Sequence, residues 1–275
     1  VRNTLAILEL FGRTDVPVFE GPGHARAKDS FEVQEISAFI HGQNGIGEVE
    51  IPDAARQVEE TSAVDFLVDS VHKYGDELVI VPTGPSTTIA AAIEASNVFR
   101  DGAQIVMMGG ALTVPGNVTA WSEANIHQDP EATDLMFRSL RNVTMIGLDV
   151  TLQTLLTTAE TAKWAELGTA GGAFLADITN YYIDAYKTTS PHLGGCGLHD
   201  PLAVAVAINP GLVGTLGINM KGDTEGETRG RTIGDEARLN DPDKHAAVAV
   251  RVDTEGFLQE FMHRLSVLAQ ATPVV

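Results

Sequence analysis

The stretch GGALTVPGNVTAWSEANIHQDPEA, residues 109–132, decides how the rest of the chain is interpreted. It follows the apolar run Ile105–Met108, which predicts a buried strand, and it precedes the helical pattern of Glu131–Leu140. Long polar segments that follow buried strands are where α/β proteins place their binding sites. The sequence therefore predicts a site-bearing loop at the end of a strand.

Three polar side chains in this loop, Asn117, Glu123 and Asn125, suit a ligand with several hydroxyl groups. Amides both donate and accept hydrogen bonds, and a carboxylate accepts them from hydroxyls. That combination is typical of sugar recognition. Asn and Glu are also common in ordinary surface loops, so the residue types alone leave both interpretations open.

The same stretch resembles the central motif of the inosine–uridine-type nucleoside hydrolases, which reads MGG, then GN, then Glu-x-Asn, then DPEA. Four further stretches agree with that family in order and rough spacing; they are HGQNGIG (41–47), VPTGPSTTIA (81–90), GLDVT (147–151) and LHDPLAVA (198–205). Five ordered motifs make the resemblance specific, and it extends from the start of the chain to about residue 207.

The chain departs from the family pattern in three places. The aspartate-rich motif D-x-D-x-G-x-D-D, a hallmark of the family, does not occur in the sequence. Thr88 stands where the family commonly has Asn, and Ala124 stands where a Phe usually lies between the Glu and the Asn. The first departure puts the metal site in doubt, because the family's remaining metal carboxylates and its general base belong to that motif.

The resemblance implies a role for each candidate site residue. His199 would be the general acid for the departing base, because imidazole titrates near the working pH. The other implied roles are ribose binding by Asn117, Glu123 and Asn125, base binding by His41, Tyr182 and Tyr186, and binding of a calcium ion by Asp200 and the backbone carbonyl of Thr83. Asp149, at a strand end, would hold the floor of the loop. The alternatives are a turn histidine for His41, ordinary helix packing for the two tyrosines and a helix cap for Asp200.

The activity implied is hydrolysis of the N-glycosidic bond of ribonucleosides by metal-activated water, within purine or pyrimidine salvage. Calcium takes 6–8 oxygen ligands, and the motifs present supply two. We therefore expect residues 1–275 alone to bind metal poorly and to hydrolyse nucleosides slowly. The main alternative is a catalytically impaired nucleoside- or sugar-binding homologue without the metal site. An unrelated serine or cysteine hydrolase is disfavoured because no G-x-S-x-G motif occurs and no base lies near Cys196 in sequence.

Composition narrows the class further. The chain has 275 residues, 44% of them hydrophobic and 20% charged, which fits one α/β domain. A net charge of −19 argues against nucleic acid and anionic membranes as partners. The single cysteine and the lack of an apolar run of membrane-spanning length favour a cytoplasmic protein. The resemblance adds a small-molecule nucleoside as ligand and a homodimer or homotetramer as assembly.

Strands that alternate with helices predict a layered, mostly parallel α/β sheet with a Rossmann-like core. Residues 1–275 form a single domain in this interpretation, apparently without its first strand–helix–strand unit, because the helical pattern that ends at Gly12 has no N-cap. The expected strands are 15–19, 78–81, 105–108 and 143–148, followed by 212–220, 227–233 and 246–252 as a late antiparallel extension. The expected helices are 1–12, 54–74, 86–95, 131–140, 158–167, 172–186, 202–208 and 257–268.

Overall fold

A computed structural model describes residues 1–272 and shows a four-stranded sheet in the order β1-β2-β8-β5. The strands are β1 (Gln104–Met108), β2 (Asn142–Ile146), β5 (Val213–Ile218) and β8 (Ala246–Val252). β1 pairs with β2, and β2 with β8, in parallel, whereas β5 runs antiparallel to β8. The predicted layered, mostly parallel sheet is confirmed.

Alternation along β1 and β2 divides the core into two hydrophobic clusters, one on each face of the sheet. Ile105 and Met107 of β1 belong to one cluster, and Met108 belongs to the other. Side chains of successive strand residues point to opposite faces, so each strand contributes to both layers. The helices that pack on the first face are α3 (Ala63–Tyr74), α4 (Thr87–Ala95), α5 (Asn97–Gly102) and α7 (Pro130–Ser139).

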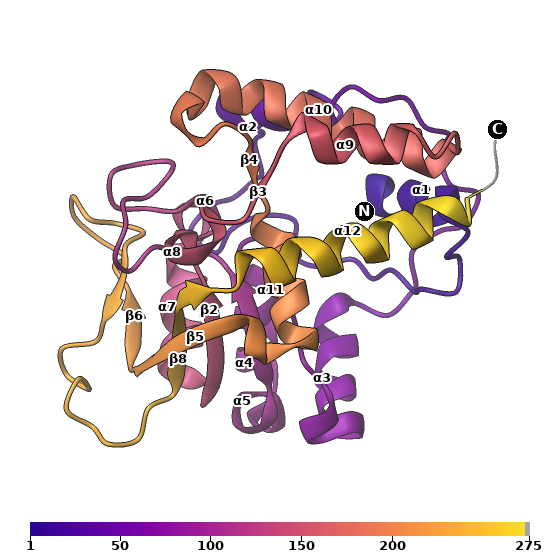
Figure 1. The fold of residues 1–275 in the computed structure, drawn as a ribbon. Coiled ribbons are helices and arrows are strands. Elements are labelled where there is room, and N and C mark those ends of the chain that lie inside the picture. Colours follow the sequence, from indigo (N-terminus) through magenta and orange to yellow (C-terminus); the bar gives the residue numbers. More distant parts are fainter. Residues whose placement is uncertain (273–275) are drawn as a thin grey trace.

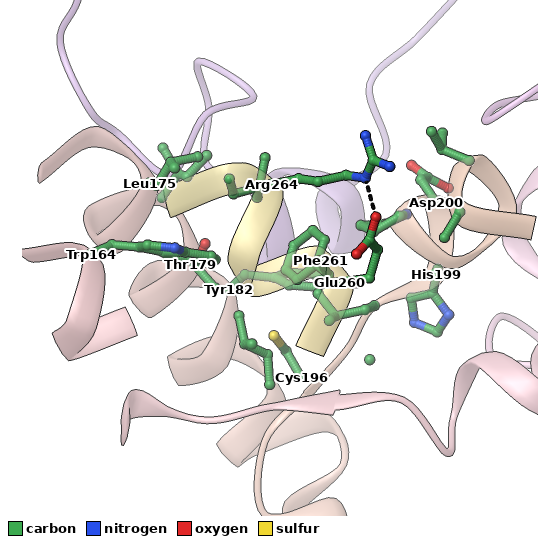
Figure 2. A pocket seen from close by; sticks show the side chains of 18 of the residues that line it. Trp164, Leu175, Thr179, Tyr182, Cys196, His199, Asp200, Glu260, Phe261 and Arg264 are labelled. Carbon is green, nitrogen blue, oxygen red and sulfur yellow. Dashed lines mark hydrogen bonds and ion pairs between the residues drawn. The ribbon is translucent and has the colours of Figure 1, made fainter. Parts of the chain in front are cut away.

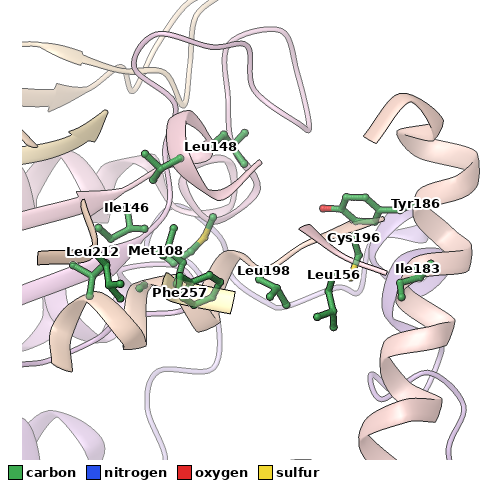
Figure 3. Close-up of a cluster of buried hydrophobic side chains, with 14 of the residues drawn as sticks. Met108, Ile146, Leu148, Leu156, Ile183, Tyr186, Cys196, Leu198, Leu212 and Phe257 are labelled. Carbon is green, nitrogen blue, oxygen red and sulfur yellow. The ribbon is translucent and has the colours of Figure 1, made fainter. Parts of the chain in front are cut away.

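The second cluster extends from the strand ends to a long helix away from the sheet. Figure 3 shows Met108 and Ile146 near the sheet, with Leu156 and Ile183 at the far end beside α10. The longest helices involved are α10 (Ala170–Thr189), α11 (His199–Ile208) and α12 (Thr254–Gln270). In Figure 1, α2, α9 and α10 lie above the sheet, and α12 crosses between them and the strands. This layer therefore brings α10 and the start of α11 over the carboxyl ends of β1 and β2.

Shorter elements complete the chain. A two-stranded antiparallel ladder, β3 with β4, places the segment after α8 beside the segment that leads into α11. A second antiparallel ladder pairs β6 with β7, and β6 lies to the left of the sheet in Figure 1. The remaining elements are α1 (Arg2–Leu10), α2 (Glu35–His41), η1 (Gly75–Glu77), α6 (Ala124–Gln128), α8 (Leu148–Thr151), β3 (Leu155–Leu156), α9 (Thr158–Ala165), η2 (Pro191–Leu193), β4 (Cys196–Gly197), η3 (Pro210–Leu212), β6 (Met220–Gly222) and β7 (Thr232–Gly234).

The carboxyl ends of the parallel strands meet at one edge, where β1 continues into Gly109 and β2 into Gly147. Gly110 has φ +84°, and a Cβ there would lie 2.8 Å from both Met145 Sδ and Thr232 Oγ1. A side chain at this position would therefore require both neighbours to move. The close approach lets the loop after β1 fold back over the end of β2.

Two expectations near the N-terminus are wrong. Residues 15–19 form no strand, because the Val18 carbonyl accepts from the Glu59 amide and the Val16 carbonyl accepts from the side chain of Arg56. The helix expected from residue 54 begins only at Ala63. The Ser62 side chain caps it by accepting from the Asp65 amide, and this cap fixes the start more strongly than the preceding periodicity.

The expected strands at 78–81 and in the C-terminal third also differ. Residues 78–81 contribute a single parallel bridge between Ile80 and Ile105. Of the late segments, β8 joins the sheet in parallel with β2, whereas β5 extends the sheet antiparallel to β8 and β6 pairs antiparallel with β7, so the predicted late antiparallel extension is present without β8. The expected strand 212–220 is interrupted at Asn219, whose buried side chain donates to the carbonyls of Arg238 and Asp243 and so braces the following loop.

Across residues 1–272, none of the helices combines the length and the apolar character needed to span a lipid bilayer.

Candidate active site

Glu123 caps helix α6 from the end of the long loop after β1. One of its oxygens, Oε2, accepts hydrogen bonds from the amides of Gly110 (2.9 Å), Asn125 (3.0 Å) and Ile126 (3.3 Å). Burial raises the pKa of this carboxyl to about 7, against the opposing effect of the three amides, and the charge of Asp200 adds to the rise. Its second oxygen, Oε1, makes no hydrogen bond to residues 1–272 and is available to a ligand.

Asn125, beside Glu123, connects the end of β1 to the segment that follows the Ile80 bridge. Its side-chain nitrogen lies 3.1 Å from the Met108 carbonyl oxygen and 3.4 Å from the Thr83 carbonyl oxygen. Asn117 faces the same helix from further along the loop, because its Oδ1 accepts from the Ala124 amide at 3.0 Å. Within residues 1–272, the side-chain oxygen of Asn125 and the NH₂ of Asn117 make no hydrogen bond. The two asparagines therefore offer complementary groups to a ligand.

His199, the first residue of α11, is hydrogen-bonded through both ring nitrogens. Nε2 lies 2.7 Å from the hydroxyl of Tyr186, and the hydroxyl of Tyr182 donates to that of Tyr186 at 3.2 Å. Nδ1 lies 2.7 Å from Oγ1 of Thr151. His41 stacks on Tyr182, with ring centroids 5.4 Å apart and an interplanar angle of 17°. The four predicted base-side residues are thus brought together.

The ionisation of His199 differs from the expectation behind its predicted role. Burial lowers the pKa of the ring to about 4, and nearby His41 lowers it further. Burial also lowers the pKa of His41 itself. At neutral pH both rings are therefore uncharged, and His199 holds its proton as a neutral imidazole within a hydrogen-bonded chain.

A pocket of about 1100 Å³ opens beside this network. Figure 2 shows Trp164 and Leu175 at one end of the pocket and His199 and Asp200 at the other. His41 and Tyr182 also line it. The ribose-side residues and Thr83 are not among its lining residues. Asp200 provides the link, because it follows His199 in the chain and is close enough to Glu123 to raise that carboxyl's pKa.

Asp200 and the Thr83 carbonyl are oxygen donors of the kind that hard cations prefer. Partial removal from water raises the pKa of Asp200 to about 6, although the residue remains exposed and lines the pocket. It makes no hydrogen bond to residues 1–272, so it does not cap α11 and its oxygens are accessible to a ligand. Within this same range, no three His, Cys, Asp or Glu side chains cluster around a common point. A carboxylate and a backbone carbonyl fit calcium in chemistry, and they would be two of the 6–8 ligands that calcium takes.

The motif GLDVT contributes more to the site than the sequence indicated. Asp149 accepts from the amides of Leu112 (2.9 Å) and Thr113 (2.6 Å) and from the Thr113 hydroxyl (2.6 Å), and so holds the floor of the long loop as expected. Thr151, two residues later, contacts His199. Thr151 carries no local signal of this contact in the sequence, because its partner lies 48 residues away.

Cys196 lies in the core and is not a nucleophile. It is 0% exposed, and burial raises the pKa of its thiol to about 12. A thiol in such surroundings stays protonated and unreactive. The alternative of a cysteine hydrolase therefore loses its only candidate nucleophile.

Comparison with known proteins agrees with this geometry. The model of the family described as inosine-uridine preferring nucleoside hydrolase matches residues 1–259. Among curated proteins, probable uridine nucleosidase 2 of Arabidopsis thaliana is 34% identical over 272 residues, which are 96% of this chain and 84% of that protein. The pyrimidine-specific ribonucleoside hydrolase RihA of Escherichia coli O7:K1 is 30% identical and covers 98% of this chain and 86% of its own.

Solved structures give the same result. The purine-preferring ribonucleoside hydrolase from Gardnerella vaginalis superposes with a TM-score of 0.96 at 64% identity, covering 98% of this chain and 86% of that one. A plant nucleoside hydrolase, PpNRh1, superposes with a TM-score of 0.88 at 29% identity, covering 96% and 85%.

Proposed function

Because this chain belongs to the inosine-uridine preferring nucleoside hydrolase family, we propose that it hydrolyses the N-glycosidic bond of ribonucleosides to ribose and free base. The observation that carries the proposal is the junction at His199–Asp200. There the hydrogen-bonded chain of tyrosines and His199 lies next to Asp200, whose charge raises the pKa of the buried Glu123 carboxyl. Glu123 in turn is flanked by the amide side chains of Asn117 and Asn125. Bond cleavage with oxocarbenium character needs a held pentose and a neutralised leaving base, and each half of the site suits one task.

The pentose would be held by Asn117, Glu123 and Asn125. The free oxygen of Glu123 accepts from a hydroxyl, the free side-chain oxygen of Asn125 does the same, and the NH₂ of Asn117 donates to one. These groups are braced by backbone hydrogen bonds before any ligand arrives. Such preorganisation supplies orientation, which lowers the activation barrier.

The leaving base would lie against Tyr182 and His41, whose stacked rings present flat apolar surfaces to the pocket. A base that departs from the C1′ carbon must gain a proton. Tyr182, Tyr186 and His199 form an unbroken line of hydroxyl and imidazole groups that can deliver one. The acid is thus the chain of groups, with His199 as its inner member.

Members of this family depend on a metal ion, and we propose calcium as the ion for this chain. Asp200 and the Thr83 carbonyl would hold it. When bound, such a cation lowers the pKa of a coordinated water. Its position beside Glu123 would also place it near the ribose-binding groups.

We propose a purine nucleoside as the preferred substrate. The support is the 64% identity to a protein titled purine-preferring, against 34% for the probable uridine nucleosidase and 30% for the pyrimidine-specific hydrolase named above. The wide aromatic pocket is consistent with a bicyclic base. Release of free base from inosine, guanosine, uridine and cytidine, followed by liquid chromatography in the presence of calcium, tests both proposals. Faster release from the purines is expected.

The binding-protein alternative makes the opposite prediction in the same experiment. A catalytically impaired homologue would bind inosine in calorimetry and release no base at any calcium concentration. That result would overturn the proposed activity, whereas faster release from uridine would overturn only the proposed preference.

We propose further that the chain acts on free nucleosides in the cytoplasm and forms a homodimer or homotetramer. Its charge of −19 disfavours nucleic acid and anionic membranes as partners. Light scattering coupled to size-exclusion chromatography gives the number of subunits. Electrophoretic mobility shift with DNA and RNA tests for nucleic-acid binding, which is expected to be absent.

A further inference from the structure

Thr232, in the short strand β7, holds the start of the long loop after β1. The residue is 1% exposed, and its hydroxyl accepts from the Ala111 amide (2.9 Å) and donates to the Ala111 carbonyl (3.1 Å). Within residues 1–272, neither backbone group of Ala111 has another hydrogen-bond partner. Because buried backbone groups need partners, this one side chain fixes Ala111 from a position 121 residues away in sequence.

Ala111 adjoins the residue that holds Glu123. The Gly110 amide donates to Oε2 of Glu123 at 2.9 Å. Thr232 also packs directly on Gly110, where an added Cβ would lie 2.8 Å from Oγ1 and 3.1 Å from Cγ2 of the threonine. The Gly110 carbonyl in turn accepts from the Leu148 amide at 2.9 Å. Two adjacent backbone residues, held from both sides, therefore connect Thr232 to the Glu123 carboxylate.

The hairpin formed by β6 and β7 also packs near the other end of the loop. Gly230 has φ +87°, and a Cβ there would overlap Oγ of Ser122, the residue before Glu123. The guanidinium of Arg231 lies over the ring of Trp121, 4.9 Å from its centroid. The hairpin thus contacts the loop on both sides of the residues that Glu123 joins.

The hairpin is attached separately to helix α7. Gly222 of β6, which pairs with Thr232, donates from its amide to Oδ1 of Asp134 at 3.2 Å. The Arg229 guanidinium donates to Oε2 of Glu131, in the first turn of the same helix, at 3.0 Å. Because α7 packs on the sheet, these contacts give the hairpin a fixed position from which Thr232 can hold the loop.

We propose that Thr232 is a positioning residue for pentose binding: it fixes Ala111 and Gly110, and through Gly110 it holds the Glu123 carboxylate where a ribose hydroxyl can reach it. The proposal rests on the proposed function, because Thr232 acts through the proposed ribose ligand. It also assigns a task to the hairpin, which lies beyond the sequence motifs that end at residue 205.

Thr232→Val tests the hydroxyl, because valine keeps the size of the side chain and leaves both backbone groups of Ala111 without a partner. We expect kcat/KM for inosine to fall about 10- to 100-fold, as when a substrate-holding group is slightly misplaced. Thr232→Ser keeps a hydroxyl and should recover most of the loss. Thr161→Val is the matched control, because Thr161 is also buried and its hydroxyl makes a 2.7 Å hydrogen bond to Asn180. It should lower the melting temperature and leave kcat/KM unchanged.

A double variant separates positioning from a general loss of stability. If Thr232 acts through Glu123, adding Thr232→Val to Glu123→Gln should cost little beyond the loss that Glu123→Gln causes alone. Residues that act independently would give losses that multiply, and that result would overturn the proposal. An unchanged kcat/KM in Thr232→Val, or an equal loss in Thr161→Val, would also overturn it.

Hydrogen exchange gives a readout that does not need turnover. Because coupling between two sites is reciprocal, saturating ribose should slow amide exchange at Gly110, at Ala111 and in residues 229–232 of the unaltered chain. Exchange that ribose leaves unchanged at these amides overturns the proposal, even if Thr232→Val does not fold. If ribose protects these amides but the chain releases no base, the hydrolase function fails and the positioning role stands. Base release without this protection has the opposite meaning.

Discussion

The carboxylate of Glu123 accepts a 2.9 Å hydrogen bond from the backbone amide of Gly110. This contact joins the two ends of the long loop, since Gly110 begins it and Glu123 ends it at the cap of α6. The same carboxylate is 2% exposed. Because this group caps α6 and also holds Gly110, the shape of the loop is coupled to the ionisation of one side chain, which we propose as a ribose ligand.

The stability contributed by Glu123 should fall as pH rises. Its pKa of about 7 in the folded chain lies above the ordinary 4.5, so the folded state holds a proton that the unfolded state releases. The contribution is complete below about 4.5 and is lost as pH rises through about 7. Urea unfolding of the unaltered chain and of Glu123→Gln at pH 5, 6, 7 and 8 gives the free energy of unfolding of each. The unaltered chain should lose stability relative to Glu123→Gln at each step up in pH. A difference that is independent of pH would contradict this. Asp200 also has a raised pKa and would add its own pH dependence, so Asp200→Asn is introduced into both chains to remove that contribution.

Asn125→Asp should destabilise the fold, whereas Asn117→Asp should not. The Asn125 side chain donates to the carbonyls of Met108 and Thr83, so a carboxylate there would place oxygen against oxygen. Asn117 uses its oxygen to accept from Ala124, and an aspartate can do the same. We expect a loss of about 1–3 kcal/mol for Asn125→Asp and a change within about 0.5 kcal/mol for Asn117→Asp. Chemical denaturation measures both, and similar losses in the two variants would refute the assignment.

Tyr186→Phe should reduce turnover more than Tyr182→Phe. The first removes the hydroxyl that lies 2.7 Å from His199 and so interrupts proton delivery at its centre. The second keeps the aromatic stack on His41 and leaves the Tyr186–His199 hydrogen bond in place. We expect kcat to fall about 100-fold for Tyr186→Phe and about 10-fold or less for Tyr182→Phe. Steady-state kinetics with inosine provides the comparison; the reverse order would show that the proton does not travel through Tyr186.

The sequence was sufficient to locate β1, β2 and β8 to within two residues and insufficient to give the contacts at their ends. Apolar runs bounded by glycines, such as Ile105–Met108 before Gly109, define buried strands through local chemistry. The predicted start of α3 was wrong because the Ser62 cap determines where the helix begins, despite nine residues of helical periodicity before Ala63. Helix ends depend on individual hydrogen bonds, and these leave little trace in a periodic pattern.

The electrostatics of the site could not be predicted, for a different reason. An isolated histidine titrates near neutral pH, and this property supported the role first assigned to His199. Its pKa falls to about 4 because burial removes the ring from water and because His41, which is distant in sequence, adds to the shift. The Thr151 contact has the same origin. Long-range packing, and not the motif, determines how the histidine can act.

Calcium binding should depend on the ionisation of Asp200 and should therefore weaken in acid. The cation requires the carboxylate form, and burial places the pKa of this group at about 6. We expect weak binding by residues 1–275, since two protein oxygens provide few of the 6–8 ligands that calcium takes. Isothermal titration calorimetry at pH 5 and pH 8 should show tighter binding at pH 8. Asp200→Asn should abolish it, whereas Asp241→Asn, an exposed aspartate, should not. Tight binding that persists in Asp200→Asn would place the ion elsewhere and separate the metal from the ribose-binding groups.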